Sequence, residues 1–172
     1  FRQPKCHLKC SNPAIGDFKI TAAADSSGTI GLIFLQNVGD LNGDGRADLV
    51  GFGLDGVFVA LALNPGPGFG PVSKWTSSFD LSHGWTVSQY VRTVGDLNGD
   101  NKADLVGFGA DGVYVALSNG TNAFNAISRW TSSFDLSHGW TVASYVRTVG
   151  DANGDGLDDL IGFGLDGVYV AP

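Results

Sequence analysis

Short apolar runs alternate with glycine-rich breaks along most of the 172-residue chain. Runs such as "ADLVGFG", "VFVAL" and "TVSQYVRTV" are too short for ordinary helices and are rich in β-branched and aromatic residues, which is typical of strands. No amphipathic stretch of useful helical length interrupts them. Most of the 26 glycines stand between the runs, where tight turns need them. The pattern therefore predicts an all-β protein.

The same order of polar and apolar positions returns three times. Asp40, Asp96 and Asp151 mark equivalent points that are 56 and then 55 residues apart. The stretch "WTSSFDLSHGWTV" at 75–87 recurs unchanged at 130–142. A period of this length is typical of β-propeller blades, each a small sheet of four strands. The sequence predicts a cysteine-containing segment at 1–17 and then about three blades of about 55 residues, at about 18–70, 71–125 and 126–172.

The second unit indicates where the strands of a blade lie. One strand is expected at 86–94 before an acidic loop and a second at 103–109 after it. Asp111-Gly112 then turns the chain into a third strand, and an outer strand is expected around 126–130. A glycine in the middle of each second strand predicts a close backbone approach, as near a crowded propeller axis. These glycines are Gly51, Gly107 and Gly162.

The units do not make a complete propeller by themselves. The first lacks the tryptophan-rich stretch before its loop, and the last ends after its third strand. A closed propeller has four to eight blades. We therefore expect that other copies of the chain or further sequence complete the ring, and an unpaired strand edge favours such association.

Charge changes the picture because it is concentrated in the three repeated loops. The formal net charge is -7, and ten of the 17 acidic residues lie in these loops. Carboxylates so close together repel one another unless a cation lies among them. The lack of a basic run argues against a nucleic-acid partner. No apolar run approaches the length of a membrane span.

Each loop places side-chain oxygens at positions 1, 3, 5 and 9 of the motif "DLNGDGRAD", and a carbonyl at position 7 could add one more. Hard oxygen ligands in a flexible arrangement suit Ca²⁺ better than Mg²⁺. Position 6 needs a sharp turn and is Gly in two loops and Asn101 in the other, which is tolerable because Asn enters the left-handed region. The motif is not an EF-hand, because a strand follows it and position 12 is not Glu. An Asx-rich turn without metal is the alternative. The predicted ligands are Asp40, Asn42, Asp44, Arg46 and Asp48; Asp96, Asn98, Asp100, Lys102 and Asp104; and Asp151, Asn153, Asp155, Leu157 and Asp159.

Such an ion would be structural, because a catalytic ion needs an open coordination position. Asp80, Ser82 and His83 are the residue types of a hydrolase triad, but neighbours this close cannot easily form its relay, and the set occurs twice. Duplicated sites suit multivalent binding. No nucleophile elbow, P-loop or H-E-x-x-H motif is present. The sequence predicts a protein that is not an enzyme.

Each full unit also combines aromatic side chains with a few polar groups, as sugar pockets do. Packing between blades is the alternative, and we expect it for Trp75 and Trp130 in the outer strands. An arginine in an apolar strand needs a partner, which could be a loop carboxylate, an anion or a sugar. The candidate sugar-binding residues are His83, Trp85, Tyr90 and Arg92 in one unit, and His138, Trp140, Tyr145 and Arg147 in the next.

The N-terminus indicates where the protein functions. The chain begins with Phe1 and contains no methionine, as a processed or excised product without its signal peptide would. Cys6 and Cys10 favour a short-range disulfide in an oxidising compartment. A zinc site with His7 is the alternative, but it would have only three ligands. We therefore expect a secreted or extracellular protein.

The combination "D-x-N-G-D-G-x-x-D-L-V-G-F-G" resembles the FG-GAP, or integrin-α-like, propeller repeat. More narrowly, "GW…YVRTVGDLNGD…ADLVGFG…GVYVAL" is similar to the repeats of the Psathyrella velutina-type fungal lectins, from about Gly31 to the end. The resemblance implies a propeller with calcium in its loops and sugar pockets between neighbouring repeats. It also implies N-acetylglucosamine, or sialic acid in some members, as ligand, bound by the "SHGW" stretches at 82–85 or 137–140 with the nearby tyrosines and arginines. Members of that family have more repeats in one chain. The alternative function is a calcium-stabilised adhesion propeller that binds protein.

Overall fold

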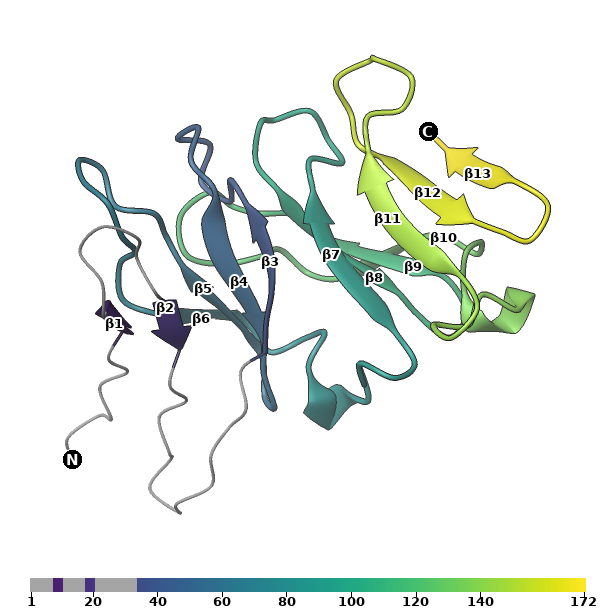
Figure 1. Ribbon diagram of the computed structural model, residues 1–172, viewed down its shortest axis with the longest axis horizontal. Coiled ribbons are helices and arrows are strands. Elements are labelled where there is room, and N and C mark those ends of the chain that lie inside the picture. Colours follow the sequence, from purple (N-terminus) through teal and green to yellow (C-terminus); the bar gives the residue numbers. More distant parts are fainter. Residues whose placement is uncertain (1–7, 11–17, 21–33) are drawn as a thin grey trace.

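The structure, a computed structural model, describes residues 8–10, 18–20 and 34–172. Its regular elements are strands, apart from two single-turn 3₁₀ helices (Figure 1), so the prediction of an all-β protein is confirmed. The strands are β1 (Leu8–Cys10), β2 (Phe18–Ile20), β3 (Phe34–Gly39), β4 (Asp48–Phe52), β5 (Val57–Ala60), β6 (Ser73–Thr76), β7 (Val91–Gly95), β8 (Asp104–Phe108), β9 (Val113–Ala116), β10 (Ser128–Thr131), β11 (Val146–Gly150), β12 (Asp159–Phe163) and β13 (Val168–Ala171). The 3₁₀ helices are η1 (Leu81–His83) and η2 (Leu136–His138).

The strands after β2 form three antiparallel sheets in chain order, which we call blades. Blade 1 is β3-β4-β5-β6, blade 2 is β7-β8-β9-β10, and blade 3 is β11-β12-β13. The first strands β3, β7 and β11 contact one another from blade to blade, and Figure 1 shows the three sheets side by side. The sheets do not close into a ring. This arrangement confirms the prediction of propeller blades, with four strands in each of the first two.

Each sheet is offset from the predicted repeat boundaries. The boundaries expected at 70/71 and 125/126 fall before β6 and β10, which pair with β5 and β9 and complete blades 1 and 2. The strand expected at 86–94 is also shorter, because the Thr86 carbonyl accepts the N–H groups of Gln89 and Tyr90 and so forms a turn. The hairpin expected at Asp111-Gly112 is confirmed by the pairing of β8 with β9.

The N-terminal strands form a separate two-stranded sheet. Leu8 pairs with Ile20 and Cys10 with Phe18, so this hairpin spans the boundary predicted at 17/18. Cys6 and His7 lie outside the described residues. The predicted disulfide therefore falls outside the part of the chain that the structure describes.

The hydrophobic core lies between the blades. One cluster joins Phe52, Val57 and Trp75 of blade 1 to Leu105 of blade 2, with Phe79 from the chain that leads out of blade 1. A second cluster joins blade 2 to blade 3. Its buried residues are Leu97, Val106, Phe108, Val113, Phe134 and Leu160. Each blade is therefore stabilised mainly by its neighbour, as in other repeat proteins.

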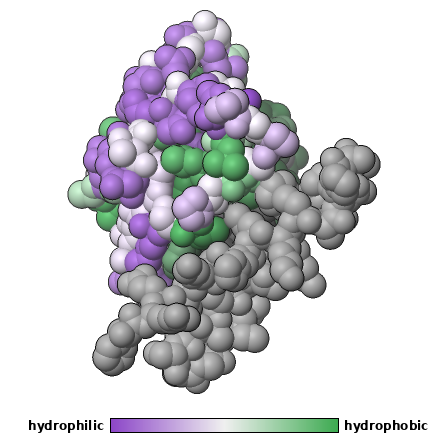
Figure 2. Space-filling model, turned by 90° about the vertical axis from the view of Figure 1, so that its left-hand side faces the viewer, coloured by the Kyte–Doolittle hydropathy of each residue, from purple (hydrophilic) through white to green (hydrophobic). Residues whose placement is uncertain are grey.

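Both ends of the row of blades expose apolar surface. Phe108 and Val113 of blade 2 are 0% exposed, whereas their counterparts in blade 3, Phe163 and Val168, are 46% and 58% exposed. Figure 2, seen from the blade 1 side, shows hydrophobic atoms bordered by hydrophilic ones. In blades 1 and 2 the next blade covers the equivalent face. The outward face of blade 3 is therefore a surface of the kind that a further blade would cover.

Candidate functional site

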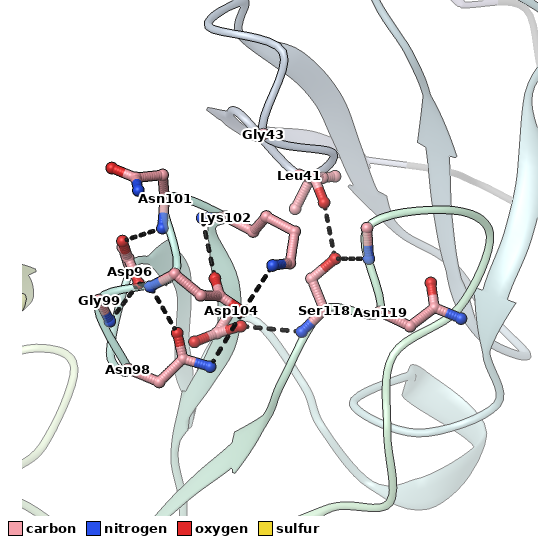
Figure 3. Close-up of polar contacts among 12 residues, drawn as sticks. Leu41, Gly43, Asp96, Asn98, Gly99, Asn101, Lys102, Asp104, Ser118 and Asn119 are labelled. Atoms are coloured by element: carbon pink, nitrogen blue, oxygen red, sulfur yellow. Dashed lines mark hydrogen bonds and ion pairs between the residues drawn. The ribbon is translucent and has the colours of Figure 1, made fainter.

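The acidic loops connect the first and second strands of each blade and fold around their own side chains. In the second loop, Asp96 Oδ1 accepts the backbone N–H of Gly99 at 2.8 Å, and Asp96 Oδ2 accepts that of Asn101 at 2.7 Å (Figure 3). Asn98 Oδ1 accepts the N–H of Asp100 at 3.0 Å. Asn101 has a φ of 62°, as expected for the residue that replaces glycine there. Equivalent bonds order the first and third loops.

The aspartate at position 9 has a different role. Asp104 is fully buried and accepts the N–H of Ser118 at 2.8 Å (Figure 3) and that of Leu97 at 3.3 Å. Burial raises the pKa of Asp104 to about 6, against the two backbone hydrogen bonds and with the help of nearby negative charge. Asp48 is bound in the same way by Leu41 and Ala62. In blades 1 and 2, position 9 therefore ties the loop to the segment that directly follows the third strand. In blade 3, Asp159 accepts the N–H of Ala152 at 3.0 Å within its own loop.

The described residues contain no group of three or more His, Cys, Asp or Glu side chains that could hold a metal ion. This agrees with the use of position 9 in the fold, which leaves two carboxylates and one amide oxygen in each loop. Those hard donors fit Ca²⁺ in kind. In the second loop, however, Lys102 Nζ forms an ion pair of 2.6 Å with Asp100 Oδ2. Calcium in these loops stays a prediction.

The other predicted loop positions are placed as follows. The N–H groups at position 7 donate to the position-5 carboxylates, at 3.0 Å from Arg46 to Asp44. The Arg46 side chain points away and donates through Nη1 to the carbonyl of Leu63. Leu157, at position 7 of the third loop, is exposed. The N–H groups of Lys102 and Leu157 donate in the same way to the carboxylates of Asp100 and Asp155.

Neighbouring loops are linked from blade to blade. The carbonyl of Asp40 accepts the N–H of Ala103 at 2.6 Å. Asp158 replaces that alanine in the third loop, and its Oδ2 accepts the N–H of Asp96 at 2.9 Å. Ser118 Oγ donates a buried hydrogen bond of 2.7 Å to the carbonyl of Leu41 (Figure 3). The loops therefore position the blades, whatever else they bind.

The aromatic residues lie on two segments, 79–90 and 134–145, which we call the crossing segments because each runs from one blade to the next. The first is held to blade 1, since Leu81 and Ser82 donate backbone hydrogen bonds to the carbonyls of Gly53 and Leu54. It begins with Phe79 at a φ of 58°, a conformation that costs a bulky residue of order 1–2 kcal/mol. Phe134 repeats it. Burial of the Phe79 ring in the core offsets this strain.

Asp80 caps η1 and fixes the histidine behind it. Its carboxylate is fully buried and accepts the His83 N–H at 2.9 Å, the Ser82 hydroxyl at 2.7 Å and His83 Nδ1 at 2.9 Å. Burial alone would raise the pKa of Asp80, but the hydrogen bonds from Ser82 and His83 outweigh it and hold the pKa below its ordinary value. Ser82 and His83 both bind the same carboxylate, so these residues do not form the relay of a serine nucleophile. Asp135 repeats the arrangement in the second crossing segment.

Blade 2 carries a pocket of about 310 Å³ between its crossing segment and the β8–β9 turn. The Trp85 ring lies 5.3 Å from Tyr90 and 6.0 Å from Tyr114, measured between centroids. His83 is exposed at the rim, and Ile127 lines the pocket from the β9–β10 connection. The structure thus brings together the predicted residues His83, Trp85 and Tyr90.

A glycine in β8 makes room for the tryptophan. A Cβ atom on Gly107 would lie 2.6 Å from the Trp85 ring and 2.6 Å from the Phe79 ring. Gly162 stands in the same relation to Trp140 and Phe134. A close approach is therefore found at Gly107 and Gly162, two of the three glycines for which it was predicted, but the neighbour is an aromatic ring of the crossing segment rather than the propeller axis.

Blade 3 repeats the pocket. His138, Trp140 and Tyr145 line it, with Trp140 at 5.3 Å from Tyr145 and 5.6 Å from Tyr169. Its volume is about 850 Å³, larger than that of the blade 2 pocket, which Ile127 also lines. Two pockets built from the same residue types therefore lie at successive blades.

Sequence analysis missed two residues of each pocket. Tyr114 donates through its hydroxyl to Asp111 Oδ1 at 2.7 Å, and Tyr169 does so to Asp166 at 2.7 Å. These hydrogen bonds, reinforced by burial and by the carboxylate charge, raise the pKa of both tyrosines. A signal was available, because "DGVYV" has Tyr in the two units that contain "SHGW", whereas the first unit has Phe58.

The arginines are not brought into these pockets. Arg92 is buried between blades 1 and 2, where Nη1 donates to the Phe79 carbonyl at 2.8 Å and the guanidinium lies 4.6 Å from the Phe52 ring centroid. Burial lowers the pKa of Arg92 to about 10, although the charge of Asp80 opposes this. Arg147 repeats the geometry with Phe134 and Phe108. Both arginines line a separate hollow of about 330 Å³ on the inner strands.

The outer-strand tryptophans have different surroundings. Trp75 is buried and lies 5.3 Å from the Phe124 ring, as expected for a packing residue. Trp130 is exposed, because blade 3 places no such ring against it among the described residues. The described part of the chain contains no helix with the length and apolar character needed to cross a membrane.

Comparison with known proteins bears on both the loops and the fold. The FG-GAP-like repeat matches residues 40–106 and 96–162. No curated protein matches the sequence. The solved structure of an Agrocybe aegerita lectin, described as recognising non-reducing terminal N-acetylglucosamine, is 37% identical with a TM-score of 0.74, over 97% of this chain and 43% of that chain. This chain therefore spans less than half the length of that lectin.

More distant structures share the fold alone. TcdB2-TccC3 is 19% identical with a TM-score of 0.55, over 84% of this chain and 8% of that chain. The Photorhabdus luminescens Tc holotoxin pore is 20% identical with a TM-score of 0.52, over 94% of this chain and 7% of that chain. The matched repeats cover most of the residues that form blades 1 to 3. This chain belongs to the FG-GAP-like repeat family.

Proposed function

We propose that the chain is a carbohydrate-binding part of a β-propeller lectin that binds terminal N-acetylglucosamine-type sugars at its repeated pockets. The observation that carries the proposal is the recurrence of one aromatic pocket, with His, Trp and two Tyr side chains, in blades 2 and 3. Aromatic rings pack against the apolar faces of sugars, and a few polar groups orient the hydroxyls. The likeness to the Agrocybe aegerita lectin supports the same function.

The geometry favours binding over catalysis. In each pocket the carboxylate beneath the histidine already accepts three hydrogen bonds from the neighbouring serine and histidine. Two equivalent sites of modest affinity can hold a multivalent glycan much more tightly than one site does. Duplication of the pocket therefore has a direct advantage for a lectin.

Glycan binding can be tested with a double substitution, His83→Ala and His138→Ala. Both side chains are well exposed, so the change should leave the fold intact, while removing the polar group at each rim. We expect binding of an oligosaccharide that ends in N-acetylglucosamine, measured by calorimetry, to weaken by about tenfold, as for the loss of a hydrogen bond worth about 1.4 kcal/mol.

The matched control is Gln89→Ala, which lies in the same crossing segment but lines neither pocket. Its affinity should equal that of the unaltered protein. Absence of binding to any N-acetylglucosamine-terminated glycan on an array, together with capture of a protein ligand, would instead favour an adhesion propeller.

Calcium is a second part of the proposal. The donors that would hold the ion are positions 1, 3 and 5 of each loop, with the position-7 carbonyl, because position 9 is used by the fold. When bound, Ca²⁺ would neutralise the loop carboxylates and tighten the turn. Its role would be structural, since the loops and the pockets use separate residues.

A further inference from the structure

The two arginines that lie outside the pockets are costly in the fold. Arg92 and Arg147 are only 6% and 3% exposed. Within the described part of the chain, Arg92 Nε and both Nε and Nη2 of Arg147 are buried without a hydrogen-bond partner. A buried donor without a partner destabilises a fold, and replacement of buried ionic groups by apolar side chains is often neutral or stabilising. Packing alone therefore does not account for an arginine at these positions.

Blade 1 shows that neither the inner strand nor the acidic loop needs this arginine. Leu35 of β3 holds the place in the strand register that Arg92 holds in β7, opposite the glycine of the second strand. Gln36, 56 positions before Arg92, is the counterpart by sequence spacing. The first unit also lacks the "SHGW" stretch and has Phe58 where the other units have the pocket tyrosine. Among the three units, the arginine thus accompanies the residues of a pocket.

The arginine contacts the crossing segment at the residue where that segment begins. Arg92 Nη1 donates to the carbonyl of Phe79 at 2.8 Å, and the ring of Phe52 lies against its guanidinium. Because Phe79 has a left-handed φ of 58°, this hydrogen bond holds a strained peptide in place. In blade 3, Arg147 Nη1 donates to the carbonyl of Phe134 at 3.1 Å. Each arginine therefore fixes the direction in which its crossing segment starts.

The pocket side chains follow directly from the anchored peptide. The next residue, Asp80, accepts His83 Nδ1–H at 2.9 Å through its carboxylate and the Trp85 N–H at 3.0 Å through its carbonyl. Burial lowers the pKa of Arg92 and the charge of Asp80 opposes this, so the carboxylate and the guanidinium attract each other. An ionised carboxylate can only accept hydrogen bonds, so Nε2 of the neutral His83 ring is left as an acceptor for a ligand.

We propose that Arg92 and Arg147 are positioning residues for the two pockets. Each holds the first peptide of its crossing segment, and thereby sets the tautomer of the histidine and the place of the tryptophan ring. Neither arginine lines a pocket, so neither contacts the sugar. The inference rests on the proposed carbohydrate binding, but the geometry that it concerns can be measured without a sugar.

The first test is spectroscopic and uses Arg92→Met, which removes the donor and the charge but keeps a long side chain. At about pH 8, where imidazole is neutral, nitrogen NMR of the unaltered chain should show His83 and His138 as Nδ1–H tautomers. In the variant, His83 should change toward the mixture of tautomers of an unconstrained imidazole. His138 should stay unchanged, because its own arginine is intact.

The second test counts sugar sites by calorimetry with an oligosaccharide that ends in N-acetylglucosamine. The unaltered chain should have two sites, and Arg92→Met should weaken one of them by about tenfold or more. Arg147→Met should weaken the other, at the end of the row of blades. Arg92→Lys restores a charged donor and should keep both sites. The control is Val94→Ala, which removes packing from the same inner strand and does not contact Phe79 through a hydrogen bond.

The outcomes separate a positioning role from a structural one. A general loss of structure, checked by circular dichroism, would weaken both pockets together, whereas positioning affects one at a time. The proposal would be overturned if Arg92→Met and Arg147→Met kept both sites at full affinity, or if lysine lost the site as completely as methionine. If the unaltered protein bound no such glycan, the proposed function would fail, while a changed His83 tautomer would still show that Arg92 sets the pocket geometry.

Discussion

Small changes at single residues decide whether the crossing segments can pack. Gly107 and Gly162 lie directly beneath Trp85 and Trp140, and Phe79 and Phe134 adopt left-handed backbone to fill the space beside them. Each of these positions breaks a local preference, since glycine weakens a strand and a bulky residue disfavours positive φ. Both violations occur in both pockets. We therefore attribute the strand glycine and the left-handed phenylalanine to the space that the tryptophan ring needs.

The substitution Gly107→Ala should be costly for this reason. Its new methyl group would overlap the Phe79 and Trp85 rings, and overpacking of this kind costs about 1–3 kcal/mol. Urea denaturation should show a loss of unfolding free energy in that range. Gly150→Ala is the control, because its Cβ would meet only Ile161 Cδ1 at 3.8 Å. If both variants had the same stability, the tight contact beneath Trp85 would be disproved.

At the scale of elements, sequence patterns predicted the strands and hairpins well and the connections poorly. Strands β8 and β9 and their turn follow directly from apolar runs separated by Asp111-Gly112. The crossing segment could not be read in this way, because "TVSQY" has strand composition but is held as a turn by hydrogen bonds to Thr86. Arg92 was missed as a core residue for a related reason. Its partners, the Phe79 carbonyl and the Phe52 ring, are distant in sequence.

The same limit applies to the loops. Alternating oxygens predicted four side-chain ligands, but only the structure reveals that Asp104, at position 9, accepts the N–H of Ser118, which lies 14 residues further along and just past β9. The tyrosine and aspartate of each pocket were likewise read only as strand and turn residues. Their contact depends on how the β8–β9 turn meets the crossing segment.

Calcium binding by the loops can be checked through stability. Addition of Ca²⁺ at about a hundred times its dissociation constant should stabilise the chain by about 2.7 kcal/mol per site. Thermal unfolding should therefore shift upward by several degrees with Ca²⁺ and downward with a chelator, and Mg²⁺ should have a weaker effect. The variant Asp44→Asn, Asp155→Asn should respond less. If neither Ca²⁺ nor a chelator changed the melting temperature, the loops would be Asx-rich turns without a metal ion.

At the scale of the whole molecule, stability depends on the contact between blades. Residues that are buried in blades 1 and 2, such as Phe52 and Phe108, have an exposed counterpart in Phe163. Exposed apolar patches of this kind commonly mark interaction surfaces. We expect another blade to cover the blade 3 face, whether that blade belongs to a second copy or to further sequence.

For the 172-residue chain alone, this expectation can be measured as mass in solution. We expect a species larger than one chain by light scattering, and the substitution Val168→Asp should return it to a single chain without loss of folding, since Val168 is already exposed. Val87→Asp is the control, because Val87 has similar exposure on a different part of the molecule. A monomer at all concentrations, with or without the substitution, would mean that the chain does not cover this face by association with itself.

The offset between blade and repeat has a consequence for how such a protein can grow. The crossing segment hydrogen-bonds to the turn of the preceding blade and builds the pocket of the following one. Duplication of the stretch from Trp75 to Arg129 would therefore lengthen the chain by one sheet and one complete sugar-sized hollow together, with both junctions already matched. Evolution can adjust valency in whole steps by this route, because no new interface has to be invented for each added copy.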